Sequence, residues 1–304
     1  MAGRIPISMI IHVYNNEQAL PTCLDSIISQ GSLDFEVVLV NNGSTDGSVA
    51  ICENYREKDR RVQVVHMEHD DVAVAYNNGL EAAGGRYIHF VDANDQIKEG
   101  VIEEVQSVLR HNLDVVFVDT SFYRSANFWD ISHSNILRRL CQDMPDRLWD
   151  KLIRRELLEK DDIRFTKGLV WEKVDFSIKL YLHALTYTAV DFPYYSKTEN
   201  TNKPDPEGVF SKIILTLSKW AGPAEFVYED HTHILHSWMA AMYCDYLIPM
   251  FKQLPKESRE MYKRGMGDFQ WLFDVRHERK DKLIKILYAV CGPLVASYAL
   301  SVFK

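Results

Sequence analysis

Residues 35–55 read FEVVLVNNGSTDGSVAICENY and form one complete strand–turn–helix unit. The unit opens with an apolar run at 35–40, which predicts a short buried strand. Residues 41–48 are all turn formers, and residues 49–55 have helical apolar spacing. Units of the same kind recur on both sides of this stretch.

The flanking units extend the pattern through the first 120 residues. Toward the amino terminus, Ile7–Val13 predicts a strand, and a helix follows the favourable N-cap residues Asn15 and Asn16. Toward the carboxyl terminus, strands are predicted at 62–65, 87–91 and 114–118, with one helix at 72–83 and another that follows the turn at 92–95 and runs to about Arg110. Strict alternation of strand and helix is typical of an α/β fold with an open, mostly parallel sheet and helices on both faces.

Sheets of this kind bind ligands at the carboxyl ends of their strands. The loops after the first, second and fourth strands carry Tyr14, Asn42 and Asp92, respectively. The sequence therefore predicts that these three loops line the binding site.

Composition narrows the class of protein. The chain has 304 residues, 46% of them hydrophobic and 26% charged, as in a folded globular protein. Its net charge of −8 argues against a nucleic-acid binder, which needs a basic face for phosphates. Five scattered cysteines without a Cys-x-x-Cys pair favour reduced thiols in a cytoplasmic protein, and the amino terminus predicts no signal peptide.

The second half of the chain has less regular spacing. Helices are predicted around 151–159 and 172–183, and short strands at 187–190 and 194–196. A stretch rich in Asn, Pro and Gly at 198–208 is the best boundary, and helical spacing prevails beyond it.

Carboxylates follow the strongly apolar run IHFV at 88–91. Asp92 and Asp95 at a strand end suit a hard divalent cation that bridges substrate phosphates. The alternative is structural, because Asp95 also suits the cap of a following helix.

Six spaced segments resemble one enzyme family. SMIIHVYNNEQALPTCLDSI, FEVVLVNNGSTDGS and NNGLEAAGGRYIHFVDAND, in this order, resemble the amino-terminal half of family 2 glycosyltransferases with the GT-A fold. WDKLIRRELLEKDDIRF, GLVWEKVDFSIKLYL and FPYYSKTENT resemble the acceptor side of bacterial members that build surface polysaccharides. The resemblance covers about residues 5–200.

The resemblance implies transfer of a sugar, with inversion, from a nucleotide-diphosphate sugar to a hydroxyl. A UDP-sugar is the favoured donor, and a glycan or lipid-linked molecule is the acceptor. It also implies a GT-A domain at 1–200, with a nucleotide-binding half at 1–120 and an acceptor half at 121–200, followed by a helical region at 201–304.

The resemblance also assigns residues to roles. Mn2+ or Mg2+ would be held by Asp92, Asn94 and Asp95. The catalytic residues would be Glu172, Lys173 and Asp175. The donor nucleotide would be bound by His12, Val13, Tyr14, Asn16, Asn42, Tyr76, Asp92 and Ala93.

Five positions depart from the family pattern, and all touch this site. His12 replaces a proline, Asn42 an aspartate that contacts the base, Tyr76 an arginine, Asn94 the main metal-binding aspartate and Lys173 the aspartate of the Glu-Asp pair. An amide is a weaker partner for a hard dication than a carboxylate, so metal binding should be weak.

Two hypotheses follow from the departures. In one, the protein is active, Lys173 neutralises the diphosphate and Glu172 or Asp175 is the base. In the other, it is a catalytically impaired relative that binds or scaffolds without turnover.

The carboxyl-terminal end has its own pattern. Residues 286–303 contain no charged residue, and Lys280, Lys282 and Lys285 precede them. A helix packed on the protein, an interfacial anchor and a membrane span all fit such a run, and Gly292-Pro293 would break or kink it. The basic cluster suits peripheral contact with the inner face of the cytoplasmic membrane.

Overall fold

The computed structural model describes residues 6–31, 35–118, 147–169, 172–190, 194–196, 205–221, 236, 239–240, 242–275 and 279–300. These residues form two compact units. The first holds the described residues up to Gly168 and from Glu172 to Ser196, and the second holds Leu169 and the described residues from Asp205 onward.

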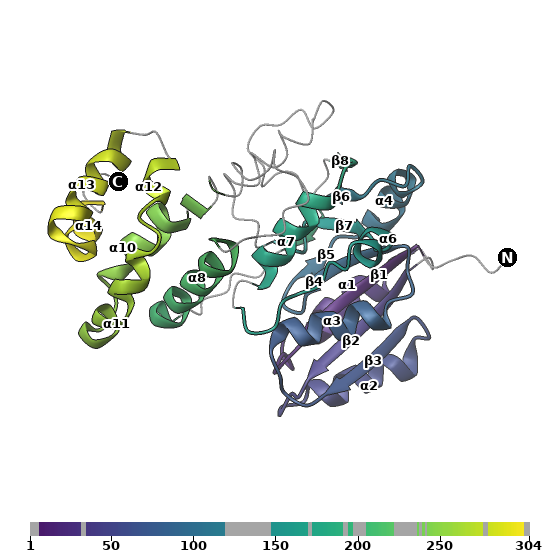
Figure 1. The fold of residues 1–304 in the computed structure, drawn as a ribbon. Coiled ribbons are helices and arrows are strands. Elements are labelled where there is room, and N and C mark those ends of the chain that lie inside the picture. Colours follow the sequence, from purple (N-terminus) through teal and green to yellow (C-terminus); the bar gives the residue numbers. More distant parts are fainter. Residues whose placement is uncertain are drawn as a thin grey trace. The chain divides into compact units, whose positions relative to one another are not determined.

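The first unit is built on a seven-stranded sheet in the order β3-β2-β1-β4-β7-β6-β8 (Figure 1). The strands are β1 (Ile7–Val13), β2 (Phe35–Asn42), β3 (Val62–Met67), β4 (Tyr87–Asp92), β6 (Val115–Phe117), β7 (Lys151–Arg154) and β8 (Tyr187–Ala189). Neighbours among β1 to β4 pair in parallel, as do β6 and β8, whereas β7 is antiparallel to both its neighbours. The predicted mostly parallel sheet is confirmed. A separate antiparallel pair joins β5 (Gln96–Ile97) to β9 (Tyr195–Ser196).

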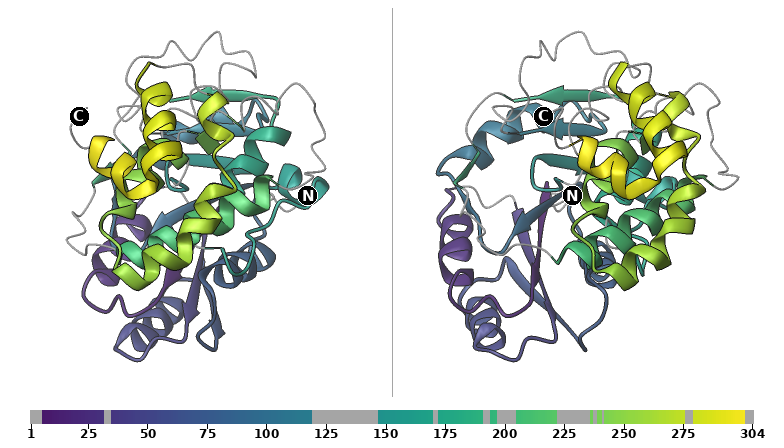
Figure 2. Two further views of the ribbon diagram at one scale, coloured as in Figure 1. Left: turned by 60° about the vertical axis from the view of Figure 1, so that its left-hand side comes forward. Right: turned by 90° about the vertical axis from the view of Figure 1, so that its left-hand side faces the viewer.

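Helices cover both faces of this sheet, as predicted. They are α1 (Leu20–Ile28), α2 (Ser48–Lys58), α3 (Val72–Ala82), α4 (Val101–Leu109), α6 (Arg155–Lys160) and α7 (Glu172–His183). The right view of Figure 2 shows α1, α2 and α4 on the face opposite α3. Alternation along the strands explains the two layers. Met9 and Ile11 pack with α1 and α4 in one core cluster, whereas Ile10 faces α3, where a Cβ on Gly79 would lie 2.5 Å from its Cγ2.

Three local expectations were wrong. Residues 151–159 form strand β7 and then helix α6 instead of one helix, because Leu152 and Ile153 complete the sheet between β4 and β6. Asp95 does not cap a helix, since β5 follows it and α4 begins only after Gly100, which has φ +81°. Helix α1 begins at Leu20 with Ala19 as its N-cap, later than Asn16.

The second unit is helical in its described residues, as predicted. Its helices are α8 (Pro206–Ala221), η3 (Met242–Leu247), α10 (Ile248–Phe251), α11 (Lys256–Gly267), α12 (Leu272–Val275), α13 (Arg279–Cys291) and α14 (Pro293–Leu300). Tyr243 packs edge-on against Phe273, 5.4 Å between ring centroids, and both rings meet Tyr288 of α13. Gly292, at φ +82°, separates α13 from α14. Among the described residues, no helix has the length and apolar character needed to cross a membrane.

Candidate active site

The carboxyl ends of β1, β2 and β4 bring His12, Asn42 and Asp92 to one edge of the sheet. His12 pairs with Asp92 in the register of β1 and β4, and its Nε2 lies 3.3 Å from Nδ2 of Asn42. His12 is two residues beyond Ile10, which faces α3, and side chains two apart share a face of a strand. The three strand ends therefore present their side chains toward α3 and α7.

Tyr76 of α3 lies directly over this edge, one turn before Gly79. Its ring centroid is 5.8 Å from that of His12, 5.4 Å from that of Phe90 and 4.8 Å from that of Phe165. It is 8% exposed. Tyr76 is therefore part of an aromatic cluster with His12, Phe90 and Phe165.

Burial in this cluster changes the ionisation of His12. Burial, and after it the positive charge of Lys173, lower the pKa of the imidazole to about 4. His12 is consequently neutral at physiological pH.

Lys173, the second residue of α7, lies on the same cluster. Its Nζ is 5.8 Å from the centroid of the Tyr76 ring, within the range of a cation–π interaction. Interaction with Tyr76 raises the pKa of Lys173 against the effect of burial, and the carboxylates of Glu172 and Asp92 raise it further. The ammonium therefore remains charged at neutral pH.

The Asp92–Asp95 turn does not gather carboxylates. Asp92 and Asn94 are exposed, but Asp95 is only 7% exposed. The backbone N–H and the side-chain amide of Asn94 both donate to Oδ1 of Asp92 at 3.0 Å. Asn16 donates in turn to Oδ1 of Asn94 at 3.3 Å, which ties the first loop to this turn.

These residues do not fit a tightly held Mn2+ or Mg2+. Such ions prefer several oxygen ligands with carboxylates among them, and this turn offers one exposed carboxylate. In the part of the chain that the structure describes, no three His, Cys, Asp or Glu side chains come together in a way that could hold an ion.

The two acids of α7 have different surroundings. Glu172 is 6% exposed and lies beside Lys173 at the start of the helix. Asp175 is fully buried, accepts a 2.8 Å hydrogen bond from Oγ1 of Thr166 and forms a 2.8 Å ion pair with Lys179. The structure thus engages Asp175 in contacts within the protein, away from Lys173.

Sequence reasoning missed the loop between β3 and α3. The His69 ring stacks on Tyr14, 4.4 Å between centroids and 25° between planes, and Tyr14 is 40% exposed. Gly43, at φ +70°, lets the chain after β2 lie directly against the backbone of His69. A Cβ at position 43 would be only 2.6 Å from the backbone nitrogen of His69. The available signal was positional, since this loop also follows a parallel strand at the ligand-binding edge.

A short segment before α7, residues 165–167, is bonded to α3 and to the loop between β3 and α3. The side chain of Asn77 bonds both backbone groups of Phe165, at 3.0 Å to its N–H and 2.9 Å to its carbonyl. Lys167 forms an ion pair of 2.8 Å with Asp70. The same segment contacts α7, since the Phe165 ring stacks on Phe176 at 4.1 Å between centroids and Thr166 donates to Asp175, so α7 is linked to the sheet edge through it.

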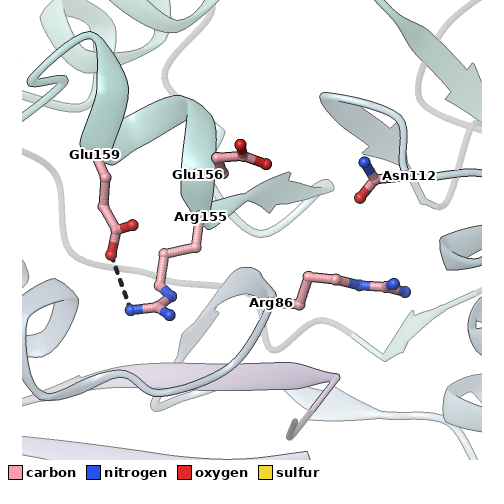
Figure 3. A pocket seen from close by; sticks show the side chains of 5 residues that line it. All are labelled: Arg86, Asn112, Arg155, Glu156 and Glu159. Atoms are coloured by element: carbon pink, nitrogen blue, oxygen red, sulfur yellow. Dashed lines mark hydrogen bonds and ion pairs between the residues drawn. The ribbon is translucent and has the colours of Figure 1, made fainter.

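A pocket of about 280 Å3 lies near the amino end of β4, away from the strand ends that carry the candidate site (Figure 3). It is lined by Arg86, Asn112, Arg155, Glu156 and Glu159. Arg86 precedes β4, whereas Asp92 ends it. Arg155 pairs with Glu159 at 2.8 Å, and Nη2 of Arg86 donates to the Leu109 carbonyl at 2.7 Å. This pocket is therefore separate from the candidate site.

Comparison with known proteins identifies the family. Residues 8–168, more than half of the chain, match the family model for Glycosyl transferase family 2. The chain is 28% identical over 222 residues to the uncharacterized glycosyltransferase YibD of Escherichia coli (strain K12), which covers 66% of this chain and 64% of that protein. It is 29% identical over 208 residues to the putative glycosyltransferase EpsH of Bacillus subtilis (strain 168), covering 62% and 59%. The chain thus spans a little under two thirds of the length of these relatives.

Solved structures agree on the fold. Staphylococcus aureus TarS 1–349, crystallised with UDP-GlcNAc, superposes with a TM-score of 0.75 at 22% identity, covering 96% of this chain and 89% of that chain. The mannosyltransferase PcManGT from Pyrobaculum calidifontis, in complex with GDP-Man and Mn2+, gives a TM-score of 0.57 at 16% identity, covering 98% and 87%. With its GT-A fold and a family match over more than half of its residues, the chain belongs to glycosyl transferase family 2.

Proposed function

We propose that the protein transfers a sugar, with inversion, from a nucleotide-diphosphate sugar to a hydroxyl of a glycan or lipid-linked acceptor in bacterial surface polysaccharide synthesis. The observation that carries the proposal is the alignment of His12, Asn42 and Asp92 at the carboxyl edge of the sheet, beside the exposed Tyr14–His69 ring pair. Family membership and the UDP-GlcNAc bound by TarS support a UDP-sugar as the donor.

The nucleotide would lie along this edge. An exposed, stacked ring pair offers a flat apolar surface for a base, so Tyr14 and His69 would hold the uracil. Val13 and Ala93 are buried, so they would contribute backbone groups only. Asn16 and Asn42 would act mainly by shaping the loops, since their side chains bond neighbouring loops.

Glu172 is the better candidate for the base, because Asp175 is engaged by Thr166 and Lys179. The base would take the proton of the acceptor hydroxyl while its oxygen attacks the anomeric carbon. The bond to the nucleotide diphosphate breaks, and the diphosphate leaves with the electron pair. A divalent ion, if bound by Asp92, would be held weakly, because this turn offers it one exposed carboxylate.

A second candidate function, binding without turnover, rests on a different observation. The Asn94 amide donates to the carboxylate of Asp92, where a second carboxylate would normally stand. A chain altered in this way could bind a sugar nucleotide or a partner enzyme without turnover.

We also propose that the second unit binds the surface of an anionic membrane, where a lipid-linked acceptor would be found. Exposed apolar side chains gather on its last two helices: Leu283, Ile286, Val290, Val295 and Tyr298. Leu283, Ile286 and Val290 recur at helical spacing on one side of α13. Residues 279–304 contain five basic residues and one acidic residue in a chain of net charge −8. Basic charge beside an apolar helical face matches an anionic lipid surface.

A paired experiment tests the function. Thermal-shift measurements with UDP, GDP and other nucleoside diphosphates at millimolar concentration come first, followed by hydrolysis assays with the matching sugar nucleotides. We expect UDP to raise the melting temperature and a UDP-sugar to be turned over. Binding without turnover of any donor would favour the impaired relative. The proposal fails if no nucleoside diphosphate changes the melting temperature.

A further inference from the structure

We propose that the ammonium of Lys173 supplies the positive charge that a divalent ion supplies in a two-carboxylate site, so that this chain binds the donor diphosphate without a metal. The inference rests on the proposed function, because it concerns the diphosphate of the same donor. The ammonium of Lys173 would oppose the negative charge of that diphosphate.

Packing between β4 and α7 places Lys173 near Asp92. Phe90 of β4 meets Phe176 of α7 edge-on, 5.8 Å between ring centroids. Asp92 is two residues beyond Phe90 on the same face of the strand. Lys173 is three residues before Phe176 and therefore on the same side of the helix. Asp92 and Lys173 are therefore the next residues on the facing sides of β4 and α7 beyond the Phe90–Phe176 contact, and the two charges interact.

The groups around Lys173 keep its ammonium charged and oriented. Tyr76 lies beneath it at 5.8 Å, and the carboxylates of Glu172 and Asp92 act on it. The cation at this edge is therefore held in place before any ligand arrives, so little side-chain entropy is lost when an anion binds.

The turn at Asp92 is poorly suited to a metal ion, which agrees with a role for the ammonium of Lys173. Asn94 donates two hydrogen bonds to Oδ1 of Asp92, which occupies an oxygen that a metal would otherwise use. A lysine in place of the aspartate of the Glu-Asp pair adds a positive charge that acts on Asp92 and so opposes the binding of a cation there. The two departures from the family pattern, Asn94 and Lys173, change the charge of the edge in the same direction.

Lys173 can perform the electrostatic part of the reaction. As the glycosidic bond to the diphosphate breaks, negative charge grows on the leaving phosphate oxygens. An ammonium offers three N–H donors and a full charge to those oxygens, and such charge-assisted bonds are about twice as strong as neutral ones. Lys173 keeps its proton throughout, because the proton of the acceptor goes to the base.

Calorimetry with UDP in EDTA tests the inference on the full chain. We expect the wild type to bind UDP equally well in EDTA and in Mn2+. Lys173→Met should weaken UDP binding by at least about tenfold, and Lys173→Arg should restore most of it, as expected for the loss and return of one charge-assisted contact. Uridine, which lacks the diphosphate, should bind both variants as it binds the wild type. A merely structural role for Lys173 would weaken uridine and UDP alike and would overturn the proposal.

A second variant keeps the test decisive if Lys173→Met folds poorly. The double variant Asn94→Asp/Lys173→Asp rebuilds the acidic pattern of the family, and we expect its UDP binding to require Mn2+. Wild-type binding that appears only with Mn2+ would contradict the inference and leave the proposed function standing. Wild-type protein that binds no UDP under either condition would instead reject the proposed function.

Discussion

The side chain of Asn42 forms two hydrogen bonds with the backbone of Asp70. Its Nδ2 donates to the Asp70 carbonyl at 2.9 Å, and its Oδ1 accepts from the Asp70 N–H at 2.9 Å. Asn42 is 2% exposed, so it joins the end of β2 to the loop that carries His69. A carboxylate at this position could accept one of these bonds but could not donate the other.

Asn42→Asp should therefore destabilise the protein. The variant leaves the half-buried Asp70 carbonyl without its donor and places a carboxylate beside it, which should lower the free energy of unfolding by about 1–3 kcal/mol. Urea denaturation at pH 7 measures the change. Asn54→Asp, on the exposed side of α2, is the matched control and should leave the midpoint nearly unchanged. An equal effect of both substitutions would argue against the Asn42–Asp70 contact.

Asn94→Asp should raise the affinity for Mn2+. It removes the amide that donates to Asp92 and adds a second exposed carboxylate, and a gain on the order of 1–3 kcal/mol is typical of one charged contact. Calorimetric titration with Mn2+ in the presence of UDP measures the gain. Asn112→Asp makes the same chemical change in the pocket near the amino end of β4 and serves as the control. Unchanged Mn2+ affinity in Asn94→Asp would place residue 94 outside the metal-binding shell.

Acid should destabilise the folded chain through His12. Burial lowers its pKa from 6.5 to about 4, and burial does the same for His89. The unfolded chain therefore takes up protons as the pH falls from 6.5 to 4 while the folded chain does not, so stability is present above 6.5 and is lost across this window. The loss should be about 3 kcal/mol per histidine, from 1.36 kcal/mol per pKa unit.

His12→Gln is the test of this assignment. It should remove a share of the acid-induced shift in the urea midpoint between pH 7 and pH 4.5 that is similar to the share of His89, and His236, whose pKa burial also lowers, adds to the remainder. His111→Gln changes an exposed histidine and is the control. A pH profile of the His12→Gln variant identical to that of the wild type would mean that His12 does not titrate as described.

Charges on α13 should reduce membrane binding. Ile286 and Val290 are 59% and 77% exposed. Ile286→Asp/Val290→Asp should lower co-sedimentation with vesicles rich in anionic lipid, because it puts two acids on the apolar face. Met261→Asp alters an equally exposed apolar residue of α11 and should sediment like the wild type. Light scattering of the same samples shows whether the face instead pairs two copies of the chain. Equal sedimentation of all three proteins would exclude this face as the membrane contact.

Local pattern determined much of the fold. The strands from β1 to β4 and the helices between them were predictable, because each alternates between buried apolar runs and turn formers within a few residues. The helical character of the second unit and the break at Gly292 were predictable for the same reason. The edge of the sheet at which Tyr14, Asn42 and Asp92 gather followed from parallel topology alone.

Only the tertiary structure decided the parts that depend on distant neighbours. Leu152 and Ile153 have helical neighbours in sequence, yet they form a strand because β4 and β6 leave a place between them. Asp95 is buried, and Asp175 is buried and paired with Lys179, although nothing in the local sequence distinguishes these two acids from the exposed Asp92. Two contacts at the site join residues that are 28 or more positions apart in sequence. They are the hydrogen bonds between Asn42 and Asp70 and the cation–π contact between Lys173 and Tyr76. Local propensity carries no information about such contacts, because burial and charge at these positions are set by whichever chain segment packs against them.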